Sequence, residues 1–239
     1  MFSTKNSIRV ALAALAVLGA THARAATIVV RASGPSAASY PPGTKLPDNG
    51  TIVLKAGDSV TVLDARGTRV LRGQGPVAVA GSKTASVNGI AALIADNGLR
   101  QTRTGATRGV TTPPHPTNVW MVDATRGGPV CVINPTALAL WRPSTAADAT
   151  LTLNAAGATT TVAFRTGQAV RAWPGDTIPV ATGTRVRLDG LASAPVTIEF
   201  HVLRTVPGTL DDAAAVLLSQ GCAAQLDVLV DSTALDTGN

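Results

Sequence analysis

The sequence predicts a mainly β protein with a small N-terminal antiparallel β module, a second antiparallel β-sandwich or barrel-like domain, and short C-terminal helices. Short runs rich in β-branched residues recur between turn residues through most of the chain, which is typical of strands. These runs follow one another closely, which favours antiparallel sheets over a parallel α/β sheet. Apolar residues take up sustained helical spacing near the C-terminus, from Thr209 onward.

The first 25 residues have the pattern of a secretory signal peptide. Basic residues precede an apolar run over residues 10–20, and this run is shorter than the roughly 20 residues that a membrane-spanning helix needs. The small residues Ala23 and Ala25 fit a peptidase site, so we expect cleavage between Ala25 and Ala26. The expected mature chain is a soluble periplasmic or secreted protein, with no membrane span after removal of the signal.

Charge and aromatic content give little reason to expect a nucleic-acid partner. The chain has 239 residues and a net charge of +6, but three cations, Lys5, Arg9 and Arg24, lie in the signal segment, so the mature chain carries only +3. Strong basic patches and aromatic stacking platforms are typical of nucleic-acid binders. Six aromatic residues remain after cleavage: Tyr40, Trp120, Trp141, Phe164, Trp173 and Phe200. We expect neither a nucleic-acid partner nor a bound cofactor.

The N-terminal module is expected to span residues 26–98. Its strands are predicted at residues 27–31, 51–54, 59–63, 68–72 and 77–80. Arg66-Gly67 provides the turn of a hairpin between the third and fourth of these strands. Residues 33–49 are rich in Gly, Pro and Ser without a hydrophobic period, which predicts a long surface loop of the kind that often contacts partners.

A short helix and a linker are predicted to follow. Apolar residues recur at helical spacing over 84–96, and Asn97-Gly98 ends the run in the manner of a helix C-cap. Residues 99–117 contain several prolines and arginines but no acid and no periodicity, which indicates a linker. Its arginines, Arg100, Arg103 and Arg108, form either a solvated connector or a contact for an acidic partner.

The C-terminal domain is expected to span residues 118–239. Its strands are predicted at residues 118–122, 130–133, 137–141, 150–153, 159–164, 169–172, 184–188 and 196–203. In the last strand, Val196, Ile198, Phe200 and Val202 alternate with polar residues, so one face is predicted to be buried. The run from Thr209 to Asp212 resembles a capping box, and apolar residues at helical spacing continue past Gly221, which predicts a broken helix or a helical pair.

The two cysteines, Cys131 and Cys222, are expected to form a disulfide, because the chain is exported to an oxidising compartment. The alternatives are free thiols or a zinc site made by these cysteines with His115 and His201. No pair among the four residues has the close spacing of zinc ligands, so we predict no metal site.

No catalytic constellation is complete in the sequence, which contains neither a G-x-S-x-G elbow nor an H-E-x-x-H motif. The glycine-rich run Gly73–Ala78 carries Pro76 and β-branched residues, so it is predicted to be a turn and strand rather than a nucleotide loop. We expect a protein without catalytic activity. The alternative is a secreted enzyme, such as a hydrolase, with a dispersed site that includes Asp58, Asp64, Glu199 and His201.

The segment Ile52–Gly75, which reads IVLKAGDSVTVLDARGTRVLRGQG, resembles the β-hairpin pattern of FecR-type periplasmic domains. The export signal, Val130-Cys131-Val132, Trp141-Arg142 and the run Gly221–Leu226 together resemble envelope proteins of proteobacteria. The resemblance implies a non-catalytic periplasmic module in signalling or assembly, and it carries over no functional residue. FecR-type proteins have a cytoplasmic segment and a membrane helix before this domain, where this chain has a signal peptide.

These observations together predict a soluble exported protein that acts by binding, as a scaffold or as an accessory to signalling. The expected partner is another envelope protein, and the sequence leaves the oligomeric state open. The loop at residues 33–49 and the arginine-rich linker are the predicted contact surfaces.

Overall fold

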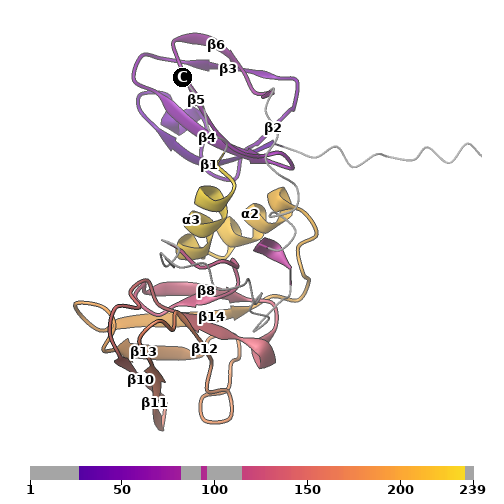
Figure 1. Cartoon of the computed structure of the whole chain (residues 1–239). Coiled ribbons are helices and arrows are strands. Elements are labelled where there is room, and N and C mark those ends of the chain that lie inside the picture. Colours follow the sequence, from indigo (N-terminus) through magenta and orange to yellow (C-terminus); the bar gives the residue numbers. More distant parts are fainter. Residues whose placement is uncertain (1–26, 82–92, 96–114, 235–239) are drawn as a thin grey trace, which may run out of the picture.

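The computed structural model describes residues 27–81, 93–95 and 115–234. This part of the chain is mainly β, with a pair of helices between two β bodies (Figure 1). We call residues 27–81 the N-terminal β body and residues 115–203 the C-terminal β body. The predicted fold class is therefore confirmed. The expected cleavage site at Ala25 and Ala26, most of the predicted helix over 84–96 and the three linker arginines lie outside the described residues.

The N-terminal β body combines a four-stranded antiparallel sheet with a separate strand pair. The sheet has the order β2-β1-β4-β5, and the pair is β3-β6. The strands are β1 (Thr27–Ser33), β2 (Lys45–Leu46), β3 (Thr51–Leu54), β4 (Ser59–Asp64), β5 (Gly67–Arg72) and β6 (Gly75–Ala78). The predicted hairpin is β4-β5, and Gly67 at its turn has a positive φ of 125°, which glycine adopts without steric cost.

Both faces of the four-stranded sheet are buried. Val29, Val60 and Val62 pack with the β3-β6 pair in one hydrophobic cluster. Ile28 and Leu63 point to the opposite face and belong to a second cluster that includes both C-terminal helices. Side chains alternate across a strand, so a sheet covered on both sides needs apolar residues at neighbouring positions, as β1 and β4 have.

The C-terminal β body is a sandwich of two sheets. The larger sheet has the order β11-β10-β13-β14-β8, and the smaller has the order β12-β9-β7. The strands are β7 (Val122–Asp123), β8 (Gly128–Val132), β9 (Ala139–Trp141), β10 (Ala149–Ala155), β11 (Ala158–Phe164), β12 (Val170–Ala172), β13 (Arg185–Asp189) and β14 (Val196–Val202). Leu140, Leu153 and Phe200 are fully buried between the sheets. Within residues 115–234, neither sheet closes into a barrel.

Two features of this body differ from the sequence-based expectations. The pairs β8-β14 and β7-β9 are parallel, within sheets that are otherwise antiparallel. Most of the predicted strand over 118–122 is instead a turn that leads into β7 at Val122, because the Asn118 side chain accepts a hydrogen bond from the Trp120 N–H at 2.9 Å. Such side-chain bonds to nearby backbone groups compete with strand pairing.

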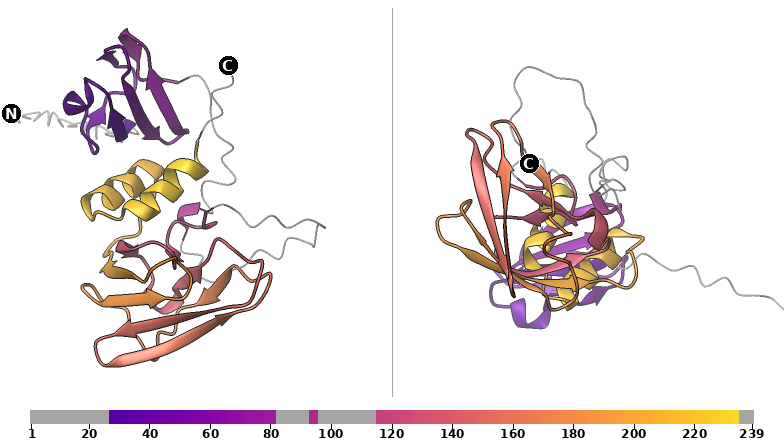
Figure 2. Two further views of the ribbon diagram at one scale, coloured as in Figure 1. Left: turned by 90° about the vertical axis from the view of Figure 1, so that its left-hand side faces the viewer. Right: turned by 90° about the horizontal axis from the view of Figure 1, so that it is seen from below.

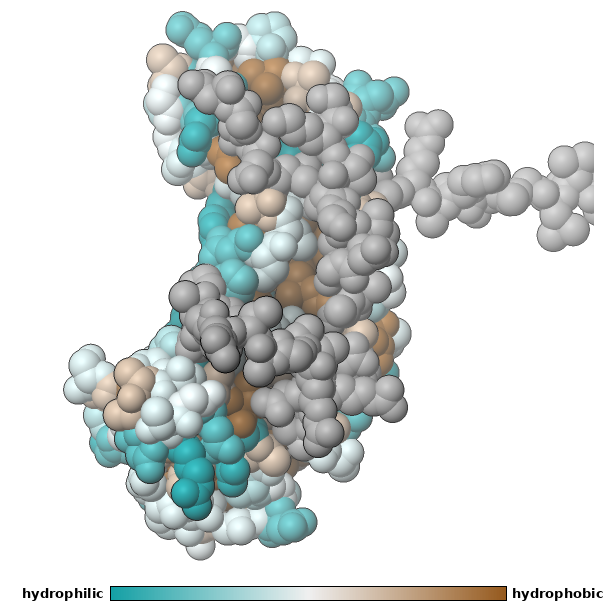
Figure 3. All heavy atoms as spheres, in the orientation of Figure 1, coloured by the Kyte–Doolittle hydropathy of each residue, from teal (hydrophilic) through white to brown (hydrophobic). Residues whose placement is uncertain are grey.

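The two C-terminal helices form a layer between the β bodies (Figure 2). They are α2 (Leu210–Ser219) and α3 (Ala223–Ser232). The predicted N-cap is confirmed, because the Thr209 hydroxyl accepts a bond from the Asp212 N–H at 3.2 Å. Gly221 turns the chain between the helices with a positive φ of 70°. The space-filling view shows the molecule narrowing at the level of this layer (Figure 3).

The helical layer shares its core with both β bodies. Helix α2 lies against β1 and β4, whereas α3 lies against β8 and β5. Leu93 and Ile94, which are helical and buried as the pattern over 84–96 predicts, join the same core. No helix in the described part of the chain is long and apolar enough to cross a membrane.

Cys131 and Cys222 form a disulfide, as the sequence predicts. The bond joins β8 of the C-terminal β body to the residue that precedes α3. Both cysteines are fully buried in the cluster that holds the helical layer. A disulfide fits the oxidising environment of an exported protein.

Candidate functional site

The four residues of the alternative hydrolase site lie in different β bodies. Asp58 and Asp64 flank the ends of β4, whereas Glu199 and His201 lie on β14, on the far side of the helical layer (Figure 1). General acid–base chemistry needs its groups within hydrogen-bonding reach of one substrate. The four residues therefore cannot form a single active site.

Asp58 has a structural role in the N-terminal β body. Its carboxylate is buried and accepts hydrogen bonds from the backbone N–H groups of Ser36, at 2.9 Å, and Lys55. Burial alone would raise the pKa of Asp58, but the hydrogen bonds from Ser36 and Lys55 outweigh it, so the pKa is lowered. The carboxylate anchors the residues after β1 to the residues before β4.

Asp64 stabilises the β4-β5 hairpin. It is buried, forms an ion pair with Arg69 at 2.9 Å and accepts a hydrogen bond from the Arg66 N–H at 2.7 Å. Arg69 also donates to the Val79 carbonyl at 3.0 Å. The Asp64 carboxylate is therefore occupied by structural contacts at the hairpin and is not exposed in a cleft.

Glu199 and His201 lie on the outer face of the larger sheet. Arg185 holds Glu199 through an ion pair of 2.7 Å, and His201 Nδ1 lies 3.0 Å from the side-chain oxygen of Gln220. His201 Nε2 is 3.9 Å from Glu199. No described nucleophile contacts this pair, so it forms a half-buried polar network beside the end of α2.

The loop predicted as a contact surface is part of the N-terminal β body. Residues 33–49 contain a short 3-10 helix (Ala37–Ser39) and strand β2, which pairs with β1. Ser36 is buried and its N–H donates to the Asp58 carboxylate, and the Tyr40 hydroxyl binds the backbone of Val53. These contacts make the loop a structural element rather than a free arm.

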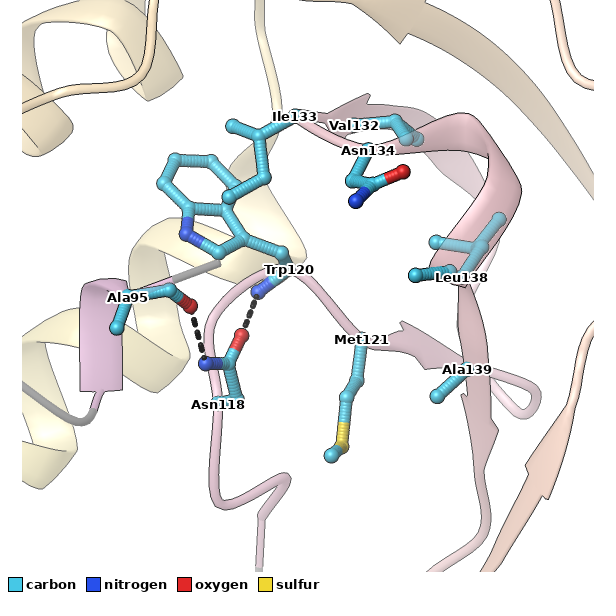
Figure 4. A pocket seen from close by; sticks show the side chains of 10 residues that line it. Ala95, Asn118, Trp120, Met121, Val132, Ile133, Asn134, Leu138 and Ala139 are labelled. Carbon is cyan, nitrogen blue, oxygen red and sulfur yellow. Dashed lines mark hydrogen bonds between the residues drawn. The ribbon is translucent and has the colours of Figure 1, made fainter. Parts of the chain in front are cut away.

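A small cavity lies beside the helical layer (Figure 4). Its volume is about 20 Å³, which is room for one water molecule. Asn118 bridges its wall, donating to the Ala95 carbonyl at 3.0 Å and accepting from the Trp120 N–H. The cavity is too small for a substrate.

The described residues contain no cluster of three or more His, Cys, Asp or Glu side chains that could hold a metal ion. The cysteines of the alternative zinc site are joined in the disulfide. His115 lies beside Ser232, near the end of α3, whereas His201 lies on the sheet. The two sulfur atoms are therefore taken up by the disulfide, and His115 lies apart from His201, which pairs with Cys131 across β8 and β14.

Most of the strand edges are closed by other groups. On the larger sheet, β8 is one edge, and the Gln225 side chain from α3 binds it as another strand would. Its amide oxygen accepts from the Cys131 N–H at 2.6 Å, and its nitrogen donates to the Cys131 carbonyl at 2.8 Å. Unpaired edges invite association with other chains, so this cap protects the β8 edge.

The β3-β6 pair is closed in a similar way. The Tyr40 hydroxyl accepts from the Val53 N–H at 3.0 Å and donates to the Val53 carbonyl at 3.1 Å. Pro76 lies opposite Val53 in β6 and has no N–H to offer on the outer side. Both edges of this pair are thus blocked.

The remaining edges, apart from one, are tied or short. Strand β5 is tied at Thr68, whose N–H donates to the Thr233 carbonyl at 2.8 Å and which bridges to Ala234. Strands β2, β7 and β12 have two or three residues each. Very short edges present few unpaired groups.

Strand β11 is the exception. It has seven residues, it ends the larger sheet, and it is uncharged with the β-branched run Thr159–Val162. Along each strand, the backbone groups of successive residues point alternately to its two sides. The Phe200 N–H donates to the Thr184 carbonyl, which fixes this alternation for β14 and β13. The pairing registers of β13 with β10 and of β10 with β11 extend it to β11. The outward backbone groups of β11 are therefore those of Thr159, Thr161 and Ala163.

A groove of about 550 Å³ runs between the edges of the two sheets. Strand β11 forms one wall and strand β12 the other. The backbone groups of Ala169 and Trp173 form hydrogen bonds toward β9. Because these groups alternate along a strand, those of Val170 and Ala172 point away from β9, toward the groove. The groove is lined by Thr161, Val162, Ala163, Gln168, Val170, Arg171, Ala172, Trp173 and Pro174.

The ends of the groove are rigid. Arg142 is buried, donates to the carbonyls of Ala147, Arg165 and Gln168 at 2.8–2.9 Å, and lies over the ring of Phe164. These bonds fix the connection between β11 and β12. At the other end, the Trp173 indole donates to the Ile178 carbonyl at 2.8 Å. A preformed groove binds at a lower entropic cost than a flexible one.

Comparisons with protein-family models, with curated proteins and with solved structures found no match to this chain. The candidate site therefore stands on its geometry: a long open strand edge beside a preformed groove. The sequence pattern predicts a strand at residues 159–164 but does not mark this strand as a binding site. The uncharged threonine run was the available signal, yet a run of this kind does not show which strand will be at an edge.

Proposed function

We propose that this protein is an exported binding or scaffold protein that receives an extended segment of another envelope protein by strand addition at β11. Main-chain hydrogen bonds to the outward groups of β11 supply affinity, and the groove accepts every second side chain of the added strand. The protein has no turnover of its own. The observation that carries this proposal is that no described group caps the edge of β11, whereas β8 is capped by Gln225, β3 is capped by Tyr40 and β5 is tied at Thr68.

The proposed compartment is the periplasm or the extracellular space. The signal-like N-terminus and the buried disulfide support it, because disulfides persist in oxidising compartments. The N-terminal β body, with its FecR-like hairpin, is proposed to act as a signalling or assembly module that the helical layer couples to the groove.

Site-specific photocrosslinking in the native envelope tests the strand addition. A photoreactive residue at Ala163, which is exposed beside the groove, is expected to give a defined adduct. Thr161→Pro removes an outward N–H without removing a bond to β10, so it should abolish the adduct. Thr161→Ala keeps this N–H and should preserve it.

Two controls make the result specific. The same photoreactive residue at the exposed Val206 should not give the adduct. Circular dichroism should show that the Thr161→Pro protein remains folded. An adduct that persists at the same yield in folded Thr161→Pro protein would exclude strand addition at β11.

A further inference from the structure

Arg171 is a charged residue at a position that faces the groove. In the β9-β12 register it pairs with Leu140, which is fully buried between the sheets. Cross-strand partners share a face of the sheet, so the Arg171 side chain starts from the inner face of the edge strand β12. It is exposed and lines the groove.

Nothing in the described residues neutralises Arg171. None of them forms an ion pair or a hydrogen bond with its guanidinium, and the groove lining contains no acid. Asp148, near the end of the groove, is occupied by the N–H and hydroxyl of Thr166 at 2.7 and 2.8 Å. Arg142, at the end of the groove, differs because carbonyls satisfy its guanidinium, and Arg165, in the connection between β11 and β12, is exposed outside the groove lining.

A lone inward-facing charge sets the chemistry of whatever enters. It disfavours an apolar or basic strand on this side, because such a strand would bury the guanidinium unpaired or place two cations together. A carboxylate, in contrast, can accept two parallel hydrogen bonds from it.

Building on strand addition at β11, we infer that the received segment is an acidic extended peptide. Its inward side chains alternate between apolar residues, which fill the hollow beside Val162, and one Asp or Glu, which meets Arg171. The backbone edge of β11 supplies affinity that is independent of sequence, and Arg171 selects among partners by charge.

Peptide display tests this inference. A library of random peptides of about nine residues, a length that covers one strand, is selected for binding to the full exported chain. The wild type is expected to enrich peptides with one acidic residue in an alternating apolar pattern. Arg171→Glu should enrich Lys or Arg at that position instead. Synthetic acidic peptides should bind Arg171→Gln about fivefold more weakly than wild type.

Arg187→Glu is the matched control, because Arg187 is exposed on β13 and does not line the groove. It should enrich the same peptides as wild type. Thr161→Pro should enrich none. An enriched pool that depends on Thr161 but has no acidic preference would overturn the inference and leave strand addition in place.

Two further outcomes are decisive. If wild type enriches no more peptides than Thr161→Pro and stays monomeric, strand addition itself is wrong. If wild type instead sediments as a dimer that Thr161→Pro dissociates, the occupant of the edge is a second copy of this chain, and the inference of an acidic partner is overturned.

Discussion

The Gln225 side chain forms the backbone hydrogen bonds that a neighbouring strand would form at the edge of β8. It is buried, and its amide binds the backbone of Cys131 and also donates to the Val119 carbonyl at 2.9 Å. A glutamine on a helix gives no sign in the sequence that it caps a sheet, because its partners are about a hundred positions away. Only the packing of α3 against β8 reveals this role.

Gln225→Leu should lower the free energy of unfolding by about 3 kcal/mol, because it leaves the Cys131 and Val119 backbone groups buried without partners. Urea denaturation followed by circular dichroism measures the change. Gln220→Leu is the control, since Gln220 is exposed and its bond to His201 lies at the surface. Equal small losses in the two variants would contradict the structural role of Gln225.

At the scale of elements, α3 is held to β8 by the disulfide between Cys131 and Cys222. These residues are 91 positions apart, so the bond restricts the unfolded chain by about 4 to 5 kcal/mol in the loop-entropy model. The Cys131→Ala/Cys222→Ala double variant should lose stability of this order. Denaturation with and without reductant measures it. Reductant should destabilise the wild type and leave the double variant unchanged.

Asp227 also fixes helix α3 to both β bodies through ion pairs. Its carboxylate pairs with Arg126 of the C-terminal β body at 2.6 Å and with Arg31 of β1. Burial raises the pKa of Asp227, but the hydrogen bonds from Arg126 and Arg31 outweigh this effect, so the pKa lies below its ordinary value of 3.8. A group with a depressed pKa contributes stability above its ordinary pKa, and this stability is lost as the pH falls through the folded-state pKa.

Asp227→Asn should therefore destabilise the protein by about 1 kcal/mol at neutral pH, a discounted value because the pair is partly exposed. The difference from wild type should shrink as the pH falls below about 4. Denaturant titrations at several pH values measure this. Asp231→Asn, which removes only a 3.9 Å contact of an exposed side chain, is the control and should change little.

The strands and helices were largely predictable, whereas their partners were not. The alternation in residues 196–203 and the hairpin around Arg66-Gly67 depend on local periodicity, which the sequence displays directly. The parallel pairing of β8 with β14 depends on which strands meet in space, and alternation does not encode it. The open edge at β11 escaped prediction for the same reason, because the order of strands in a sheet is a tertiary property.

At the scale of the whole molecule, the helical layer makes one structure of two β bodies. Ile28 and Leu63 from one body and Cys131 from the other lie in the same hydrophobic cluster as α2 and α3. Each β body would expose this apolar surface if the helices left it. Elements that share a buried core unfold together when most of their burial depends on each other.

Leu217 of α2 is the residue that tests this coupling, because it is fully buried in the shared cluster. Leu217→Ala should cost about 2 to 5 kcal/mol and should weaken both β bodies. Hydrogen exchange measured by mass spectrometry should then show β1-β4 and β10-β13 losing protection by similar free energies. Leu153→Ala, inside the C-terminal sandwich, is the comparison. If Leu217→Ala left β10-β13 fully protected while β1-β4 opened, the two bodies would be independent, and a strand bound at β11 would have no route through the helical layer to the N-terminal β body.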